Sequence, residues 1–237
     1  MTNSSRRRLV GILAATTVAL APLALTGSAQ AEAGVAARTD AQRVPQSALR
    51  STTPAVQAQV DREVAEAKAA GSKVLSIDFQ YQQTGYWCGP AATRIALSAR
   101  GILRSQQDLA NQLPTTVNGT DWIGQVTRVL SGAVGWYETK EMPNDPPTQA
   151  QRDLLWRDIT LDIDNGYAIV ANIVAPPSNH PPGYPNTTIY HYFTVIGYNP
   201  DNRDVLIADP AGFASTPTYW LSFDQLATLI PPKGYSA

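Results

Sequence analysis

The stretch from Gln82 to Ala92, which reads QQTGYWCGPAA, decides how the chain is built around its one cysteine, Cys88. Pro90 follows two residues later, and proline is favourable in the first turn of a helix because the N–H it lacks would have no partner there. The segment from Ala91 to Arg100 has high helix content, and Gly101 ends it. The sequence therefore predicts that Cys88 lies at or next to the N-terminus of a helix.

That position bears on the reactivity of Cys88. The thiolate is the nucleophilic form of cysteine, and a helix N-terminus or a nearby imidazolium lowers the pKa of a thiol below its free value of about 8.5. A glycine directly after the nucleophile, here Gly89, lets a substrate approach the backbone closely. The local sequence therefore favours a reactive thiol over a buried, inert one.

A predicted hairpin offers a base for this thiol. His191 lies in a strand candidate, Ile189 to Tyr198, and Asp209 closes the next candidate, Asp204 to Asp209, after a short connector. If the two residue numbers in each cross-strand pair add up to an even number, residues of equal parity lie on the same face of the hairpin. His191 and Asp209 are both odd-numbered, so they would then share a face. The carboxylate then accepts the imidazole N–H, fixes its tautomer and stabilises the charged ring.

Acyl transfer also needs hydrogen-bond donors for the oxyanion that develops on the attacked carbonyl. The N–H of Cys88 is one candidate, and the side-chain amide of Gln82, in the polar loop before it, is another. Gln80 and Gln83 lie near enough to compete. The only other histidine, His180, stands in a proline-rich loop, and we expect it to be exposed there.

Helical segments dominate the first part of the chain and strands the second, which is typical of an α+β fold. Four capping residues, Ser105, Thr120, Thr148 and Ser222, precede helical segments. Helices are expected over 55–70, 91–100, 105–113, 121–130 and 148–163, and after residue 222. Strands are expected over 74–79, 167–174, 189–198, 204–209 and 218–221.

The first 31 residues have the pattern of a secretory signal peptide. Three arginines from Arg6 to Arg8 precede an uncharged apolar run, Leu9 to Leu25, and a small-residue site ends at Ala31. We expect cleavage after Ala31 and a secreted protein; an uncleaved anchor is the alternative, and the pattern allows either Sec or twin-arginine export. Exported proteins usually pair their cysteines, so a lone cysteine is either buried or kept for its reactivity.

The rest of the chain divides into two predicted parts. Residues 32–72 form a flexible stretch followed by a helix, which could act as a pro-segment, a stalk or an accessory helix, and residues 73–237 form the globular domain. The formal net charge is −1, with no basic cluster after the signal, so neither a nucleic-acid partner nor, once the signal is removed, a membrane partner is expected. One cysteine and two histidines make no zinc site, and no cofactor is expected.

The order Gln82, Cys88-Gly89-Pro90, His191 in a strand and Asp209-Pro210 closing the next resembles the papain-like cysteine peptidases. It is most similar to the bacteriocin-leader (double-glycine) peptidase-like domains, over about Lys73 to the C-terminus. The resemblance implies a helical half packed against an antiparallel sheet, with the site in the cleft between them. It also implies four roles: nucleophile for Cys88, base for His191, orienting acid for Asp209 and oxyanion donor for Gln82.

The function expected from this resemblance is thiol-dependent hydrolysis of a peptide or amide bond through an acyl-enzyme, with a peptide or protein as substrate. The bacteriocin processors precede membrane transporters with an ATPase module, and this chain shows neither a membrane bundle nor a phosphate-binding loop. A double-glycine leader is therefore not implied as the substrate. Two alternatives remain open: an acyl transferase or cell-wall peptide amidase with the same triad, and a catalytically silent peptide-binding module.

Overall fold

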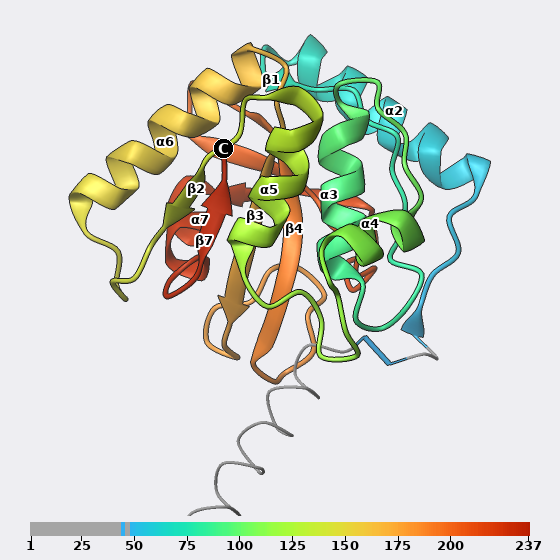
Figure 1. Cartoon of the computed structure of the whole chain (residues 1–237). Coiled ribbons are helices and arrows are strands. Elements are labelled where there is room, and N and C mark those ends of the chain that lie inside the picture. Colours follow the sequence, from blue (N-terminus) through green and yellow to red (C-terminus); the bar gives the residue numbers. More distant parts are fainter. Residues whose placement is uncertain (1–43, 46–47) are drawn as a thin grey trace, which may run out of the picture.

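An antiparallel sheet of seven strands forms the centre of the computed structural model, which describes residues 44–45 and 48–237 (Figure 1). Its strands run in the order β2-β7-β3-β4-β5-β6, and β1 pairs with one end of β4. The strands are β1 (Lys73–Val74), β2 (Thr139–Glu141), β3 (Ile169–Ala175), β4 (Ile189–Tyr198), β5 (Asp204–Ala208), β6 (Thr218–Ser222) and β7 (Gly234–Ser236). The predicted α+β class is confirmed.

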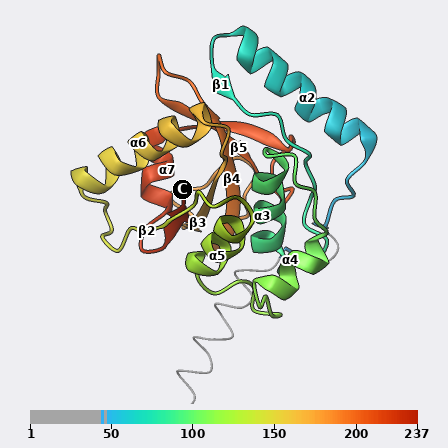
Figure 2. The same ribbon diagram turned by 45° about the horizontal axis from the view of Figure 1, so that its top comes forward.

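Helices cover both faces of the sheet (Figures 1 and 2). On one face lie α2 (Pro54–Ala69), α3 (Cys88–Ser98), α4 (Gln106–Gln112) and α5 (Ile123–Val134), which enclose the first core. On the other lie α6 (Gln149–Asp164) and α7 (Phe223–Leu229), which enclose the second core. The predicted packing of helices against an antiparallel sheet is confirmed, and α6 and α7 add a layer on the far side.

Three of the four predicted N-caps are confirmed. The side chains of Ser105, Thr148 and Ser222 each accept the backbone N–H three residues ahead, at the starts of α4, α6 and α7. The fourth prediction, a cap by Thr120, is wrong, because α5 begins two residues later with Trp122 as its N-cap. The hydroxyl of Thr120 instead shares a 2.7 Å hydrogen bond with that of Thr115.

The strand predictions are right in the centre of the sheet and wrong at its margins. The bounds of β4 are as predicted, whereas the strand expected over 74–79 is only Lys73–Val74. Ile77 and Phe79 are buried as expected, but outside any strand. The sequence did not predict β2 and β7, which have three residues each and pair with one another. Such short strands carry too few residues for an alternating pattern.

The ladder between β4 and β5 changes register once. Gly197 pairs with Leu206 near the connecting turn, and the next pair joins Val195 to Ile207. Ile196 is therefore an extra residue, a β-bulge. Its carbonyl accepts an N–H from the chain just after β1 at 2.8 Å. The numbers of paired residues add up to an odd number on the turn side of the bulge and to an even number beyond it.

The helix predicted before the globular domain is packed into the first core. Val60 of α2 is fully buried. The side-chain amide of Gln57 forms two hydrogen bonds with the backbone beyond β1: its Nε2 donates to the Ile77 carbonyl, and its Oε1 accepts the Phe79 N–H. Residues 54–72 are therefore part of the folded body. The signal peptide predicted over 1–31 lies outside the described residues. Within them, no helix has the length and apolar character that crossing a membrane requires.

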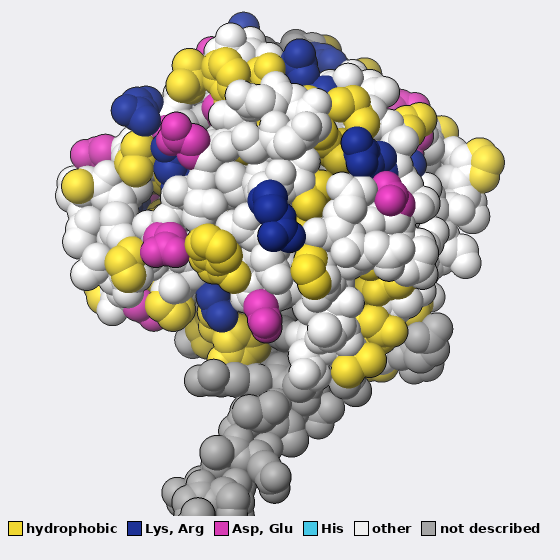
Figure 3. All heavy atoms as spheres, in the orientation of Figure 1, with side chains coloured by type: hydrophobic (Ala, Val, Ile, Leu, Met, Phe, Trp, Pro, Cys, Tyr) yellow, Lys and Arg dark blue, Asp and Glu magenta, His cyan; other side chains and the backbone are white. Residues whose placement is uncertain are grey.

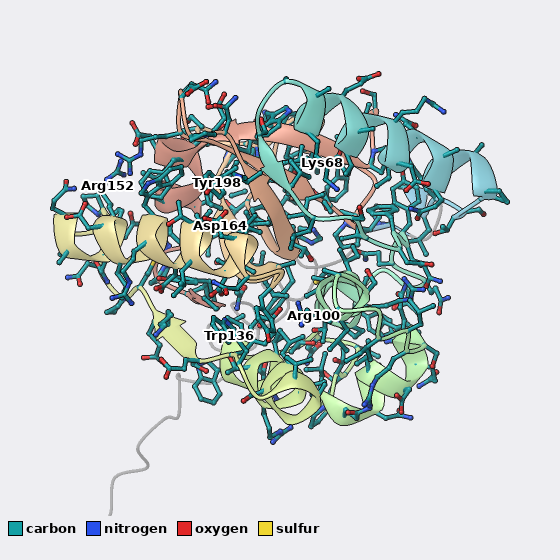
Figure 4. The ribbon with its side chains drawn as sticks, turned by 90° about the horizontal axis from the view of Figure 1, so that it is seen from above. Lys68, Arg100, Trp136, Arg152, Asp164 and Tyr198 are labelled. Carbon is teal, nitrogen blue, oxygen red and sulfur yellow. The ribbon has the colours of Figure 1, made fainter. Side chains whose placement is uncertain are left out.

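Side-chain contacts fasten the outer helices to the sheet. The Tyr198 hydroxyl donates to Asp164 at 3.0 Å, which joins the end of α6 to β4, and Figure 4 shows these two residues side by side. Arg100, just after α3, donates to the carbonyl of Asn165 and lies over the ring of Tyr167.

On the face seen in Figure 3, acidic and basic side chains are interspersed, and neither sign gathers into a patch.

β1 passes close to β4 at Gly197. A Cβ there would lie 2.7 Å from the Lys73 carbonyl oxygen and 2.8 Å from Val74 Cγ2. We expect Gly197→Ala to lower the free energy of unfolding, measured in urea, by about 1–3 kcal/mol, because the backbone of β1 must move. The control is Gly132→Ala inside α5, where a Cβ meets no atom within 4 Å. It should be neutral or stabilise by up to about 1 kcal/mol; equal effects would contradict the close approach.

Candidate active site

Cys88 is the first residue of α3, as the sequence predicts, and is 4% exposed. The N-cap residue, Trp87, supplies no side-chain cap, so it leaves the first amides of the helix for other partners. Gly89 allows the next segment to approach closely, because a Cβ there would lie 2.3 Å from the hydroxyl oxygen of Thr120. Cys88 is therefore held in a tightly packed helix start.

His191 and Asp209 meet at the ends of their strands. His191 Nε2 lies 2.8 Å from Asp209 Oδ1, and the two side chains are 3% and 2% exposed. The predicted shared face is confirmed, and the register beyond the bulge places the two residues one diagonal step apart. Since Nε2 is occupied by the carboxylate, Nδ1 is the nitrogen left to face Cys88, whose proximity contributes to the raised pKa of His191.

Burial and charge act in opposite directions on this pair. Burial lowers the pKa of His191, but the charge of Asp209, the hydrogen bond to it and the contact with Cys88 outweigh burial and raise the pKa to about 10. Burial likewise raises the pKa of Asp209, but the charge of His191 and the hydrogen bonds to the carboxylate hold it below its ordinary value. At neutral pH the pair is therefore an imidazolium and a carboxylate.

Three further donors surround Asp209. The hydroxyls of Tyr184 and Tyr219 both donate to Oδ2, at 2.8 and 2.6 Å, and the N–H of Ala211 donates to Oδ1 at 2.9 Å. Sequence analysis did not predict these donors. Tyr219 could have been found only from the register of β5 with β6, which places it on the same face as Asp209. Tyr184 comes from the loop between β3 and β4, where no periodic pattern points to it.

Gln82 is the buried member of the three candidate glutamines. It is 1% exposed, its Nε2 donates to the Thr84 carbonyl at 2.8 Å, and its Oε1 has no hydrogen-bond partner among the described residues. The side chain of Gln80 is bonded to Gln106 of α4, and Gln83 is exposed. One N–H of the Gln82 amide is therefore left over after the bond to Thr84.

The remaining histidine lies at the edge of this cluster, where its ring is 6.3 Å from that of Tyr184 between centroids. A ring nitrogen of His180 lies 3.0 Å from the carbonyl oxygen of Thr187, within the same loop. His180 is half-buried, which corrects the expectation of an exposed residue. Among the residues that the structure describes, no group of three or more His, Cys, Asp or Glu side chains could hold a metal ion.

The lining of a cavity of about 250 Å³ includes Asp121, Trp122, Glu141, Asn172 and Lys233. The buried amide of Asn172 donates to the Tyr192 hydroxyl at 2.9 Å. Burial, together with the charges of Cys88 and Asp121, holds the pKa of Tyr192 well above its ordinary value. Tyr192 therefore lies within electrostatic reach of both the cavity and Cys88. Trp122, 53% exposed at the cavity, presents a large apolar surface to solvent.

Comparison with known proteins points to one family. Residues 74–228 match the model of the Peptidase_C39 like family, which confirms the resemblance to bacteriocin-leader peptidase-like domains. All four residues that the resemblance singles out lie inside the matched range. No curated protein matches the chain.

Two solved structures are distantly similar. One is the peptidase domain of Streptococcus ComA, a bi-functional ABC transporter involved in a quorum-sensing pathway; it is 18% identical with a TM-score of 0.45, over 67% of this chain and 96% of that one. The other is a Bacillus anthracis protein assigned as a C39-like peptidase; it is 12% identical with a TM-score of 0.47, over 70% of this chain and 96% of that one.

Proposed function

This chain belongs to the Peptidase_C39 like family, and from that membership and the geometry around Cys88 we propose that it hydrolyses peptide bonds through a Cys88-His191-Asp209 triad. The observation that carries the proposal is the position of His191. One ring nitrogen is 2.8 Å from the buried Asp209 carboxylate, and Cys88, at the start of α3, lies near enough to help raise the pKa of the ring. A nucleophile, a base and a group that orients the base are the parts that covalent acyl transfer requires.

In the first half of the proposed reaction, the Cys88 thiolate attacks the carbonyl carbon of the scissile bond. The carbonyl π electrons move to oxygen, and the imidazolium of His191 then gives its proton to the leaving nitrogen as the C–N bond breaks. The products are a free amine and a thioester on Cys88. The 2.8 Å bond to Asp209 holds the ring in place as its charge changes.

In the second half, neutral His191 takes a proton from water as the water oxygen attacks the thioester. The C–S bond breaks, the acid product leaves, and the thiolate and imidazolium are restored. The oxyanion formed in both halves needs N–H donors. The amide of Cys88 and the remaining N–H of Gln82 are the donors we propose, because Trp87 leaves the helix start without a side-chain cap and Gln82 is held beside its own loop backbone.

The proposed substrate is a peptide segment, one side chain of which rests in the cavity at Trp122. A volume of about 250 Å³ suits a single side chain, and the exposed indole supplies apolar contact area. We also propose that the reaction takes place outside the cytoplasm, on the basis of the signal-peptide pattern in residues 1–31.

The proposal predicts that His191 makes Cys88 reactive toward an alkylating agent at mildly acidic pH. Because it is the only cysteine, the rate of alkylation by iodoacetamide reports on it alone. At about pH 6.5, His191→Ala should slow alkylation about 100-fold, since a thiol of pKa about 8.5 is only about 1% ionised there. His180→Ala, which leaves the Cys88, His191 and Asp209 side chains intact, is the matched control and should react like the wild type.

Slow alkylation of the wild type, with no change in His191→Ala, would overturn the catalytic proposal and favour a silent peptide-binding module. Fast alkylation without hydrolysis in water, but with product formation when an amine is added, would point to an acyl transferase. The two readouts together therefore separate a hydrolase from an acyl transferase and from a silent binding module.

The raised pKa of His191 sets the alkaline side of the pH profile. The imidazolium persists below the raised value and is lost as the pH rises through about 10. Since the leaving amine takes its proton from this ring, kcat/KM for a peptide substrate should hold through mildly alkaline pH and fall near pH 10. A fall centred near pH 6.5, the value of an unperturbed histidine, would contradict the buried ion pair.

The placement of a substrate side chain at Trp122 predicts a binding defect. Trp122→Ala should raise KM about tenfold and leave kcat within about twofold, because it removes contact area that substrate and transition state share. The control is Trp220→Ala, a 38% exposed tryptophan that lines a different cavity, between α2 and β6. Equal KM values for the two variants would place the substrate elsewhere.

A further inference from the structure

Asp209 has every accepting position of its carboxylate occupied. Oδ2 accepts two phenol O–H groups, from Tyr184 at 2.8 Å and Tyr219 at 2.6 Å, whereas Oδ1 accepts His191 at 2.8 Å and the Ala211 N–H at 2.9 Å. A carboxylate has about four lone-pair sites, so this arrangement saturates it. Only one of the four donors, His191, belongs to the proposed triad.

We propose that Tyr184 and Tyr219 are positioning residues that act through Asp209, keeping its carboxylate ionised and rotated so that Oδ1 faces His191. This inference rests on the proposed function, since it depends on the role of Asp209 as the orienting acid. Neither hydroxyl is proposed to touch the substrate. Their effect reaches the reaction through His191, which stays charged only while its partner does.

Burial explains why such donors are needed. Asp209 is 2% exposed, and an ionised carboxyl without water takes up a proton unless other groups stabilise its charge. A protonated acid would offer His191 no negative charge. The hydroxyls of Tyr184 and Tyr219 are suited to this task because they stay protonated and can donate. Burial, and to a smaller extent the nearby charge of Asp209, holds the pKa of each tyrosine well above 10.0.

The groups that face Asp209 come from separate elements. Tyr219 projects from β6, where it pairs with Ile207 of β5, and His191 projects from β4. Tyr184 comes from the loop between β3 and β4 and packs edge-on against Phe213 at 4.9 Å between ring centroids. Among the described residues, these three side chains are the titratable groups that bond the carboxylate, and Cys88 lies near His191.

Gly183 lets the loop bring Tyr184 this close. Its φ is +76°, and a Cβ there would lie 2.3 Å from the Phe213 carbonyl oxygen. The loop backbone is therefore pressed against the chain that follows Asp209. Because Tyr219 belongs to the sheet and Tyr184 to this loop, loss of one hydroxyl leaves the other in place, and the two effects can be measured separately.

The test removes each hydroxyl alone, in Tyr184→Phe and Tyr219→Phe, and follows the Asp209 carboxyl carbon by ¹³C NMR as the pH falls. Loss of a donor favours the protonated acid, so the titration should move to higher pH, by about one pH unit for each hydroxyl. The matched control is Tyr235→Phe, which removes a 2.9 Å bond from a buried tyrosine to Asp158 in the second core.

A merely structural role would lower the melting temperature of all three variants and leave the Asp209 titration in place, and that result overturns the proposal. A second measurement needs no variant. In the wild type, Asp209 should titrate below the ordinary aspartate value of about 3.9, and titration at or above that value also overturns it. If the Asp209 titration moves as expected but wild-type Cys88 is unreactive, the proposed function fails. The conclusion that the two tyrosines stabilise the ionised form of Asp209 would still hold.

Discussion

The pairing of β4 with β5 is the constraint on which the site depends. In the register that the connecting turn establishes, His191 and Asp209 would lie on opposite faces of the sheet, because one step of register exchanges the faces. The bulge at Ile196 absorbs one residue and brings both side chains to the same face. It is held from outside by β1, which pairs with β4 at Gly197 and leaves no space for a side chain there. A two-residue strand far from the chemistry thus helps to set its geometry.

The site also joins two cores that the sheet separates. Cys88 belongs to the first core, on the helix that packs against one face. His191 stands next to Phe193, and Asp209 lies under Tyr184 and Tyr219, all three of which belong to the second core. The reacting groups are buried near the start of β4, where parts of both cores come together. The distance between nucleophile and base therefore depends on how both layers pack on one strand.

Much of this could be predicted from the sequence, for reasons specific to each element. Cys-Gly-Pro predicts the start of α3 because proline has few other places in a helix, and the hairpin predicts the shared face of His191 and Asp209 once parity is assumed. The parity itself depends on a bulge, and no pattern at Ile196 predicts one. Thr120 is of a residue type that often caps helices, yet its hydroxyl forms a hydrogen bond with that of Thr115 and its side chain packs against Gly89. These contacts outweigh the local preference for a cap. The catalytic roles themselves remain predictions.

Burial has two opposite consequences for this site, and they explain why so many groups surround one carboxylate. Removing water strengthens the attraction between the imidazolium and Asp209, which is what raises the pKa of His191 despite its own loss of solvent. The same loss of water makes an incompletely bonded carboxylate unstable in its charged form. A buried hydrogen-bond network in which some polar groups lack partners therefore destabilises the fold, whereas a network in which every group is paired stabilises it. The carboxylate in this protein is completely bonded, so its charge persists in a site that excludes solvent. The same exclusion of water would strengthen the oxyanion contacts during catalysis.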